Sequence, residues 1–191
     1  MVLSIQESLG PYITITYAAA AALCDLETGK IGNPLILLGW TTGLCLHTIW
    51  CMPAAQGTAE MVFSGTLRWF SGALIPLLPG ILLHRFGMIG AGDGKLLSAV
   101  GSCVGPGGSV RVMLASVFCG ALVSLPLMVS VSGIRERMLY FASYVRETAE
   151  TGQIHSYRRS SGGPLRPEEF HFSVPVFMAV VLYMGGFLSR L

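Results

Sequence analysis

The sequence predicts an all-α, polytopic integral membrane protein with about six transmembrane helices. Of its 191 residues, 52% are hydrophobic and 12% are charged, about half the charged share of a typical soluble domain. The mean hydropathy is +0.65, and several apolar runs approach the length that crosses a bilayer. These features exclude disordered, collagen-like, coiled-coil and nucleic-acid-binding classes. We expect one membrane-embedded domain over residues 1–191, with the lipid bilayer as its surroundings.

Six apolar runs define the expected spans. Five of them approach the roughly 20 residues that a spanning helix needs: residues 9–26, 34–52, 61–83, 109–132 and 173–189. The sixth, residues 94–105, is short, because a helix of this length rises only about 18 Å against a hydrocarbon core of about 30 Å. The first run has no Lys or Arg before it, so we interpret it as a retained span rather than a signal peptide.

The basic residues support this count of six. With the N-terminus outside, segments 27–33, 84–95 and 133–172 face the cytoplasm and hold nine of the twelve Lys and Arg residues. This excess agrees with the positive-inside rule. Within the long inner segment, apolar residues at helical spacing over 134–150 predict a helix at the membrane face. A Gly/Ser/Arg/Pro-rich loop is expected to follow it.

The cysteines and histidines indicate no metal site, disulfide framework or cofactor. The five cysteines are odd in number and form no CxxC pair, and the four histidines show no metal-ligand spacing. No phosphate-binding loop or serine-nucleophile motif occurs either. Chemistry must therefore be sought among the few charged residues that the spans retain.

The chain contains two aspartates, Asp25 and Asp93. In the six-span topology Asp25 closes the first span and Asp93 opens the fourth, so both lie at the cytoplasmic face. Two close carboxyl groups hydrolyse peptides by sharing one proton, because like charges about 3 Å apart cannot both ionise. Gly90 and Gly92, which precede the second aspartate, allow close approach of backbone or substrate. The pattern favours an aspartic peptidase.

Other interpretations remain open on the residues alone. Asp93 is also suited to a helix N-cap, and Asp25 to an interfacial helix end. A small membrane carrier or channel subunit uses buried carboxylates for cations or protons. A non-catalytic assembly protein of a pilus or secretion system needs neither aspartate.

Two segments of the sequence resemble motifs of a known family. Residues 90–101, GAGDGKLLSAVG, resemble the GxGDxKLLxxxG signature of type IV prepilin peptidases, and residues 25–33, DLETGKIGN, resemble the segment of their first aspartate. The final span, from Phe172 onward, resembles the family's last helix. Gly32 stands where the family usually has proline, and Gly94 where it often has a branched apolar residue; we expect both to make the loops more flexible.

The resemblance implies an aspartic endopeptidase that cleaves the leader of prepilin or pseudopilin substrates on the cytoplasmic side of a bacterial or archaeal cell inner membrane. Asp25 and Asp93 match the two catalytic aspartates, while Gly90, Gly92, Lys95 and Asn33 match supporting motif positions. Larger bacterial members also methylate the new N-terminus and carry a cysteine-containing cytoplasmic domain. This chain resembles the short members, so cleavage without methylation is expected.

Overall fold

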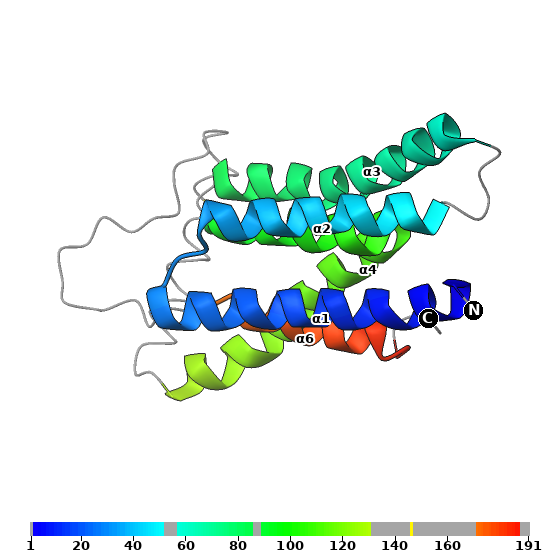
Figure 1. Cartoon of the computed structure of the whole chain (residues 1–191). Coiled ribbons are helices and arrows are strands. Elements are labelled where there is room, and N and C mark those ends of the chain that lie inside the picture. Colours follow the sequence, from blue (N-terminus) through cyan, green and yellow to red (C-terminus); the bar gives the residue numbers. More distant parts are fainter. Residues whose placement is uncertain (1, 52–56, 86–88, 131–145, 147–170, 188–191) are drawn as a thin grey trace.

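The computed structural model describes residues 2–51, 57–85, 89–130, 146 and 171–187, and the elements in this part of the chain are all helices (Figure 1). They are α1 (Val2–Thr28), α2 (Asn33–Cys51), α3 (Thr58–Arg85), α4 (Ala91–Ser130) and α6 (Ser173–Met184). The all-α prediction is therefore confirmed for the described residues. The predicted helix over 134–150 and the loop after it lie almost wholly outside them.

The membrane prediction is also supported. Helices α1, α2, α3 and α4 each contain a stretch that is long and apolar enough to cross a bilayer, and α6 is a shorter apolar helix. Many large apolar side chains lie on the surface, among them Phe63, Phe70, Leu114 and Phe118. Such a surface is unusual for a soluble monomer and suits contact with lipid. The count of six spans and their orientation remain predictions.

Helix α4 contains both the expected fourth and fifth spans, joined by a sharp bend. Gly105 has φ 77° and ψ 178°, which interrupts the helical backbone. Beyond it the chain turns back, since a Cβ on Gly101 would lie 3.1 Å from the Cβ of Ser109, whereas eight residues of straight helix span about 12 Å. In Figure 1 the later, yellow-green part of α4 returns toward the end of the bundle where α4 begins.

Helix α6 ends earlier than the sequence suggested. The predicted span reached residue 189, but the helix stops at Met184. Gly186 has φ 80°, and the N–H groups of Gly186 and Phe187 donate to the carbonyl oxygens of Tyr183 and Leu182. These two bonds form a Schellman motif, which ends helices at a left-handed glycine. Twelve residues rise about 18 Å, so α6 alone is shorter than the hydrocarbon core.

Small residues let α3 and α4 pack closely. A Cβ on Gly72 would collide with the carbonyl oxygen of Gly101, and a Cβ on Gly80 would lie 2.9 Å from the Cα of Gly94. Close backbone approach through glycine is typical of membrane helices. Gly94 is thus part of a helix–helix contact in the first turn of α4, not of a flexible loop as the sequence suggested.

One end of the bundle gathers several helix termini. Figure 1 shows the end of α1, the start of α2 and the start of α6 at the same end, where α3 also finishes and α4 begins. The start of α1 and the end of α6 lie at the opposite end. The aspartates therefore meet here, because Asp25 lies in the last turns of α1 and Asp93 in the first turn of α4.

Candidate active site

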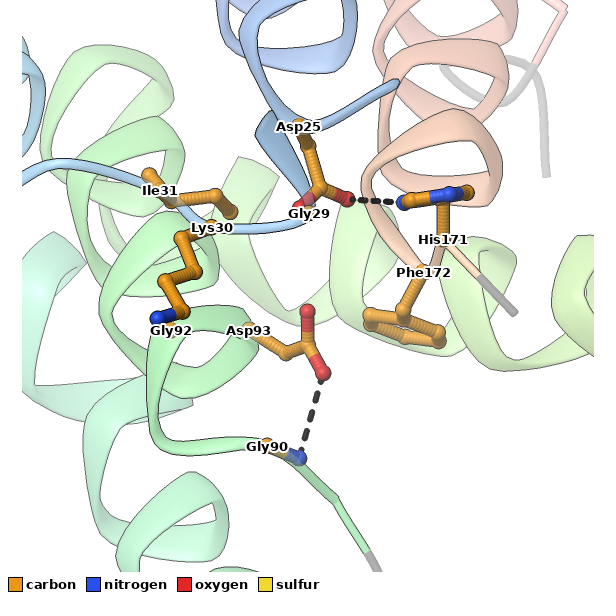
Figure 2. Close-up of a pocket in the computed structure, with 9 residues that line it drawn as sticks. All are labelled: Asp25, Gly29, Lys30, Ile31, Gly90, Gly92, Asp93, His171 and Phe172. Atoms are coloured by element: carbon orange, nitrogen blue, oxygen red, sulfur yellow. Dashed lines mark hydrogen bonds and ion pairs between the residues drawn. The ribbon is translucent and has the colours of Figure 1, made fainter. Parts of the chain in front are cut away.

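The two aspartates line one pocket of about 510 Å³ at this end of the bundle. This volume is within the range of about 300–1,000 Å³ that is usual for ligand pockets. Figure 2 shows the two carboxylates directed into the pocket from opposite sides. Gly90 and Gly92 line it as well, with Gly29, Lys30, Ile31, His171 and Phe172. Four of the six residues predicted for the site thus come together around one space.

Asp25 is almost completely buried, with 7% of its surface exposed. Its Oδ2 atom accepts a short hydrogen bond of 2.6 Å from the hydroxyl of Ser173, and the Nδ1 atom of His171 lies 3.3 Å from the same oxygen. Both partners come from the start of α6, 146 and 148 residues away in sequence. The carboxylate is therefore an internal group held by another helix, not an interfacial helix end.

Asp93 occupies the third position of α4. Its Oδ2 accepts a 3.2 Å hydrogen bond from the N–H of Gly90, and its own N–H donates to the carbonyl oxygen of Gly90 over 3.2 Å. This reciprocal pair resembles a capping box in which glycine takes the N-cap position. Asp93 thus helps to cap α4 through one oxygen, although it is not the N-cap residue, while the other oxygen points into the pocket (Figure 2).

Two helix N-termini face these carboxylates. Asp93 lies within the first turn of α4, and Asp25 is bonded to Ser173, the first residue of α6. The positive ends of helix dipoles stabilise nearby negative charge. Asp93 is also close enough to Asp25 and His171 to interact with both electrostatically. Two acidic groups are thereby held in one small pocket.

The turn after α1 forms one wall of the pocket. Gly29 has φ 64°, and its N–H donates to the carbonyl oxygen of Asp25 over 2.8 Å. This is the left-handed glycine cap that commonly ends helices. The hydroxyl of Thr28 bonds both backbone groups of Lys30, so the chain is turned back directly after Asp25 and brings Lys30 and Ile31 to the pocket.

Lys95 and Asn33 lie beside the pocket and contact each other. The Nζ atom of Lys95 donates a 3.2 Å hydrogen bond to Oδ1 of Asn33. The two residues stand 62 positions apart, near the starts of α4 and α2. They connect the two motif segments and do not line the cavity; their supporting role stays a prediction.

Sequence reasoning missed His171 and Ser173. The run from Phe172 was noticed only as the opening of an apolar span, and a single histidine before it carries no spacing pattern. A polar residue at an expected helix start, on the same membrane face as the aspartates, is the signal that was available. Among the described residues, no group of three or more His, Cys, Asp or Glu side chains is arranged to hold a metal ion.

Comparison with known proteins adds the family. The model of the type IV leader peptidase family matches residues 12–125, which is more than half of the chain. The chain belongs to this family. No curated protein and no solved structure gives a significant match.

Family membership identifies a leader-peptidase-like protease, and the apolar helices identify a multi-pass membrane protein. The matched range contains both aspartates, Asn33 and Lys95, and it ends before α6. The two side chains that bond Asp25 therefore lie outside the part of this leader peptidase that the family match covers.

Proposed function

We propose that this chain is an aspartic endopeptidase of the cell inner membrane that removes the leader from prepilin-like proteins at the cytoplasmic face, without N-methylation. The observation that carries the proposal is the convergence of Asp25 and Asp93 on one pocket. They are the chain's two aspartates, and they reach this pocket from different helices.

The proposed reaction uses one carboxylate as base and the other carboxyl group as acid. The base takes a proton from a water molecule while the oxygen of that water attacks the scissile carbonyl carbon. The acid gives its proton to the carbonyl oxygen. In the second step a proton passes to the amide nitrogen, the C–N bond breaks, and a carboxylic acid and a free amine leave. The two groups exchange roles between the steps, so the aspartate pair returns to its starting protonation.

The substrate class follows from the family and from the site's location. Type IV leader peptidases act on leader peptides, and a leader must reach the pocket as extended chain while its apolar helix lies among the spans. Backbone at Gly29, Gly90 and Gly92 and the apolar side chains of Ile31 and Phe172 surround the space for it. The positive-inside pattern supports the cytoplasmic face for this end.

Cleavage is the assay that tests the proposal. Membranes containing the wild type, Asp25→Asn or Asp93→Asn are mixed with candidate prepilins, and products are identified by gel shift and N-terminal sequencing. We expect cleavage by the wild type and none by either variant. The N-terminal amine of the product should carry no methyl group. Glu27→Gln is the matched control, because it neutralises an exposed carboxylate two residues from Asp25 that does not line the pocket.

The cleavage assay separates the peptidase from the alternative functions. No cleavage of several prepilins by well-folded wild type contradicts the peptidase and favours a carrier or an assembly protein. Equal cleavage by the wild type and both aspartate variants indicates a contaminating protease and removes the argument for the aspartate pair.

A further inference from the structure

The described residues that hold Asp25 all do so through one of its two oxygens. Ser173 and His171 both contact Oδ2, at 2.6 and 3.3 Å. No described residue donates a hydrogen bond to Oδ1, although Asp25 lines the pocket. The two oxygens of this carboxylate are therefore chemically distinct within the described residues, because these residues bond Oδ2 and none of them bonds Oδ1.

The hydroxyl of Ser173 is used in an unusual way. Serine near the start of a helix commonly caps the free N–H groups of the first turn. Helix α6 has no side-chain cap at its N-terminus, yet Ser173 lies in its first turn and is completely buried. Its hydroxyl donates to Asp25 instead. The hydroxyl of Ser173, which follows the N-cap residue Phe172, thus serves a carboxylate on α1 and not its own helix.

His171 adds a second, differently oriented contact. A carboxylate only accepts hydrogen bonds, so the contact requires the proton of the imidazole to be on Nδ1. The carbonyl oxygen of His171 meanwhile accepts the N–H of Val174, which ties the residue to the start of α6. The charged or titratable side chains that line the pocket with it are Asp25, Asp93 and Lys30.

We propose that His171 and Ser173 are positioning residues that hold Oδ2 of Asp25, so that Oδ1 is the oxygen that meets the attacking water. The inference rests on the proposed peptidase function, and it deepens that function by assigning a task to α6, which lies outside the matched family range. It also gives Asp25 the role of the first base. Asp93, which keeps one oxygen in the pocket, then supplies the acid.

Kinetics on the purified full-length protein test this, with a prepilin that the wild type cleaves. His171→Ala removes the donor, and His171→Asn returns an N–H close to the place of Nδ1. Because a misplacement of about 1 Å can lower a rate on the order of 100-fold, we expect His171→Ala to lower kcat by at least about tenfold with little change in KM. His171→Asn should recover part of that loss.

A serine pair provides the matched comparison. Ser173→Ala should lower kcat as His171→Ala does. Ser116 is equally buried, but its hydroxyl bonds only the carbonyl oxygen of Val112 in its own helix, so Ser116→Ala should leave kcat unchanged. Unchanged kcat in both His171→Ala and Ser173→Ala, or no recovery with Asn, overturns the proposal.

A spectroscopic measurement separates failure of this inference from failure of the peptidase function. In protein labelled with ¹⁵N-histidine, Asp25→Asn should shift the ring-nitrogen signals of His171, assigned by their loss in His171→Ala, whereas Glu27→Gln should not. If the wild type cleaves no prepilin, the peptidase function fails and the nitrogen signals alone decide whether the contact exists. If the ring-nitrogen signals of His171 do not shift in Asp25→Asn, the positioning contact is contradicted, whether or not the protein cleaves a prepilin.

Discussion

The ammonium group of Lys95 donates a hydrogen bond to the side-chain oxygen of Asn33 over 3.2 Å. This contact joins α4 to α2 near the start of each helix, and Asp93 lies two residues before Lys95. Asn33 begins α2 directly after the turn that follows Asp25. The position of Asp93 therefore depends on a segment that is adjacent in sequence to Asp25.

Removing either partner should loosen this connection. A hydrogen bond of this kind contributes about 0.5–1.5 kcal/mol, so Lys95→Ala and Asn33→Ala should each lower stability by about 1 kcal/mol and reduce cleavage. The double variant should be no worse than the more affected single variant, because both remove the same bond. Thermal unfolding in detergent and cleavage rates measure the two effects.

The control for this pair is Arg111→Ala, which removes an exposed basic side chain from the later part of α4. Losses that simply add in the double variant mean that the two side chains act independently, and the connection between the motif segments then has no energetic basis.

Gly90 and Gly92 should differ sharply in their tolerance of alanine. A Cβ on Gly90 would lie 3.0 Å from Oδ2 of Asp93, whereas a Cβ on Gly92 would meet Ile31 at an ordinary 3.8 Å. Gly90→Ala should therefore displace the carboxylate and lower kcat on the order of 100-fold. Gly92→Ala should fold well, because alanine favours helix by about 1 kcal/mol over glycine, and should lose much less activity.

The comparison is read from cleavage rates, with circular dichroism to verify that both variants fold. Equal activity of Gly90→Ala and Gly92→Ala contradicts the claim that Gly90 is required for the position of the Asp93 carboxylate.

The sequence was informative where a residue type was rare. Because the chain contains two aspartates, and the expected topology places both at one membrane face, their proximity could be predicted from the sequence. The contacts from α6 could not be predicted in this way. His171 and Ser173 reach Asp25 across more than 140 residues, and neither forms a pattern with its neighbours.

Backbone conformation was the other unpredictable feature. Periodicity predicts that a helix exists, but the left-handed glycine that ends α6 and the one that bends α4 look like any other glycine among the chain's 24. Gly94 was likewise expected to loosen a loop. Glycine is needed at this position because the backbone of Gly94 lies close to Gly80 on α3, and this contact depends on tertiary packing.

Gly94→Val tests that packing. A Cβ on Gly94 would already lie 3.3 Å from the Cα of Gly80, and valine adds two more methyl groups in a buried position. Overpacking of this kind costs about 1–3 kcal/mol, so the unfolding temperature should fall. Cleavage should fall as well, because Asp93 is the adjacent residue.

Gly107→Val is the control, since a Cβ at Gly107 has nothing within 4 Å. If Gly94→Val is as stable and active as Gly107→Val, then α3 and α4 do not need their close approach at this point.

Gly105 should tolerate alanine poorly, because its backbone conformation suits glycine. Its φ of 77° and ψ of 178° lie in a region that is essentially restricted to glycine and costs other residues on the order of 1–3 kcal/mol. A Cβ there would also lie 3.0 Å from Cε1 of His47, which is buried. Gly105→Ala should therefore lower the unfolding temperature in detergent, and it should reduce activity only as far as the fold is lost.

Gly107→Ala provides the comparison two residues further on, where a Cβ meets nothing within 4 Å and the backbone is helical. Alanine favours helix by about 1 kcal/mol over glycine, so this variant should be at least as stable as the wild type. A Gly105→Ala protein that unfolds at the temperature of Gly107→Ala would mean that α4 reverses without the left-handed backbone at residue 105. The two parts of α4 would then owe their arrangement to packing against the neighbouring helices α2, α3 and α6.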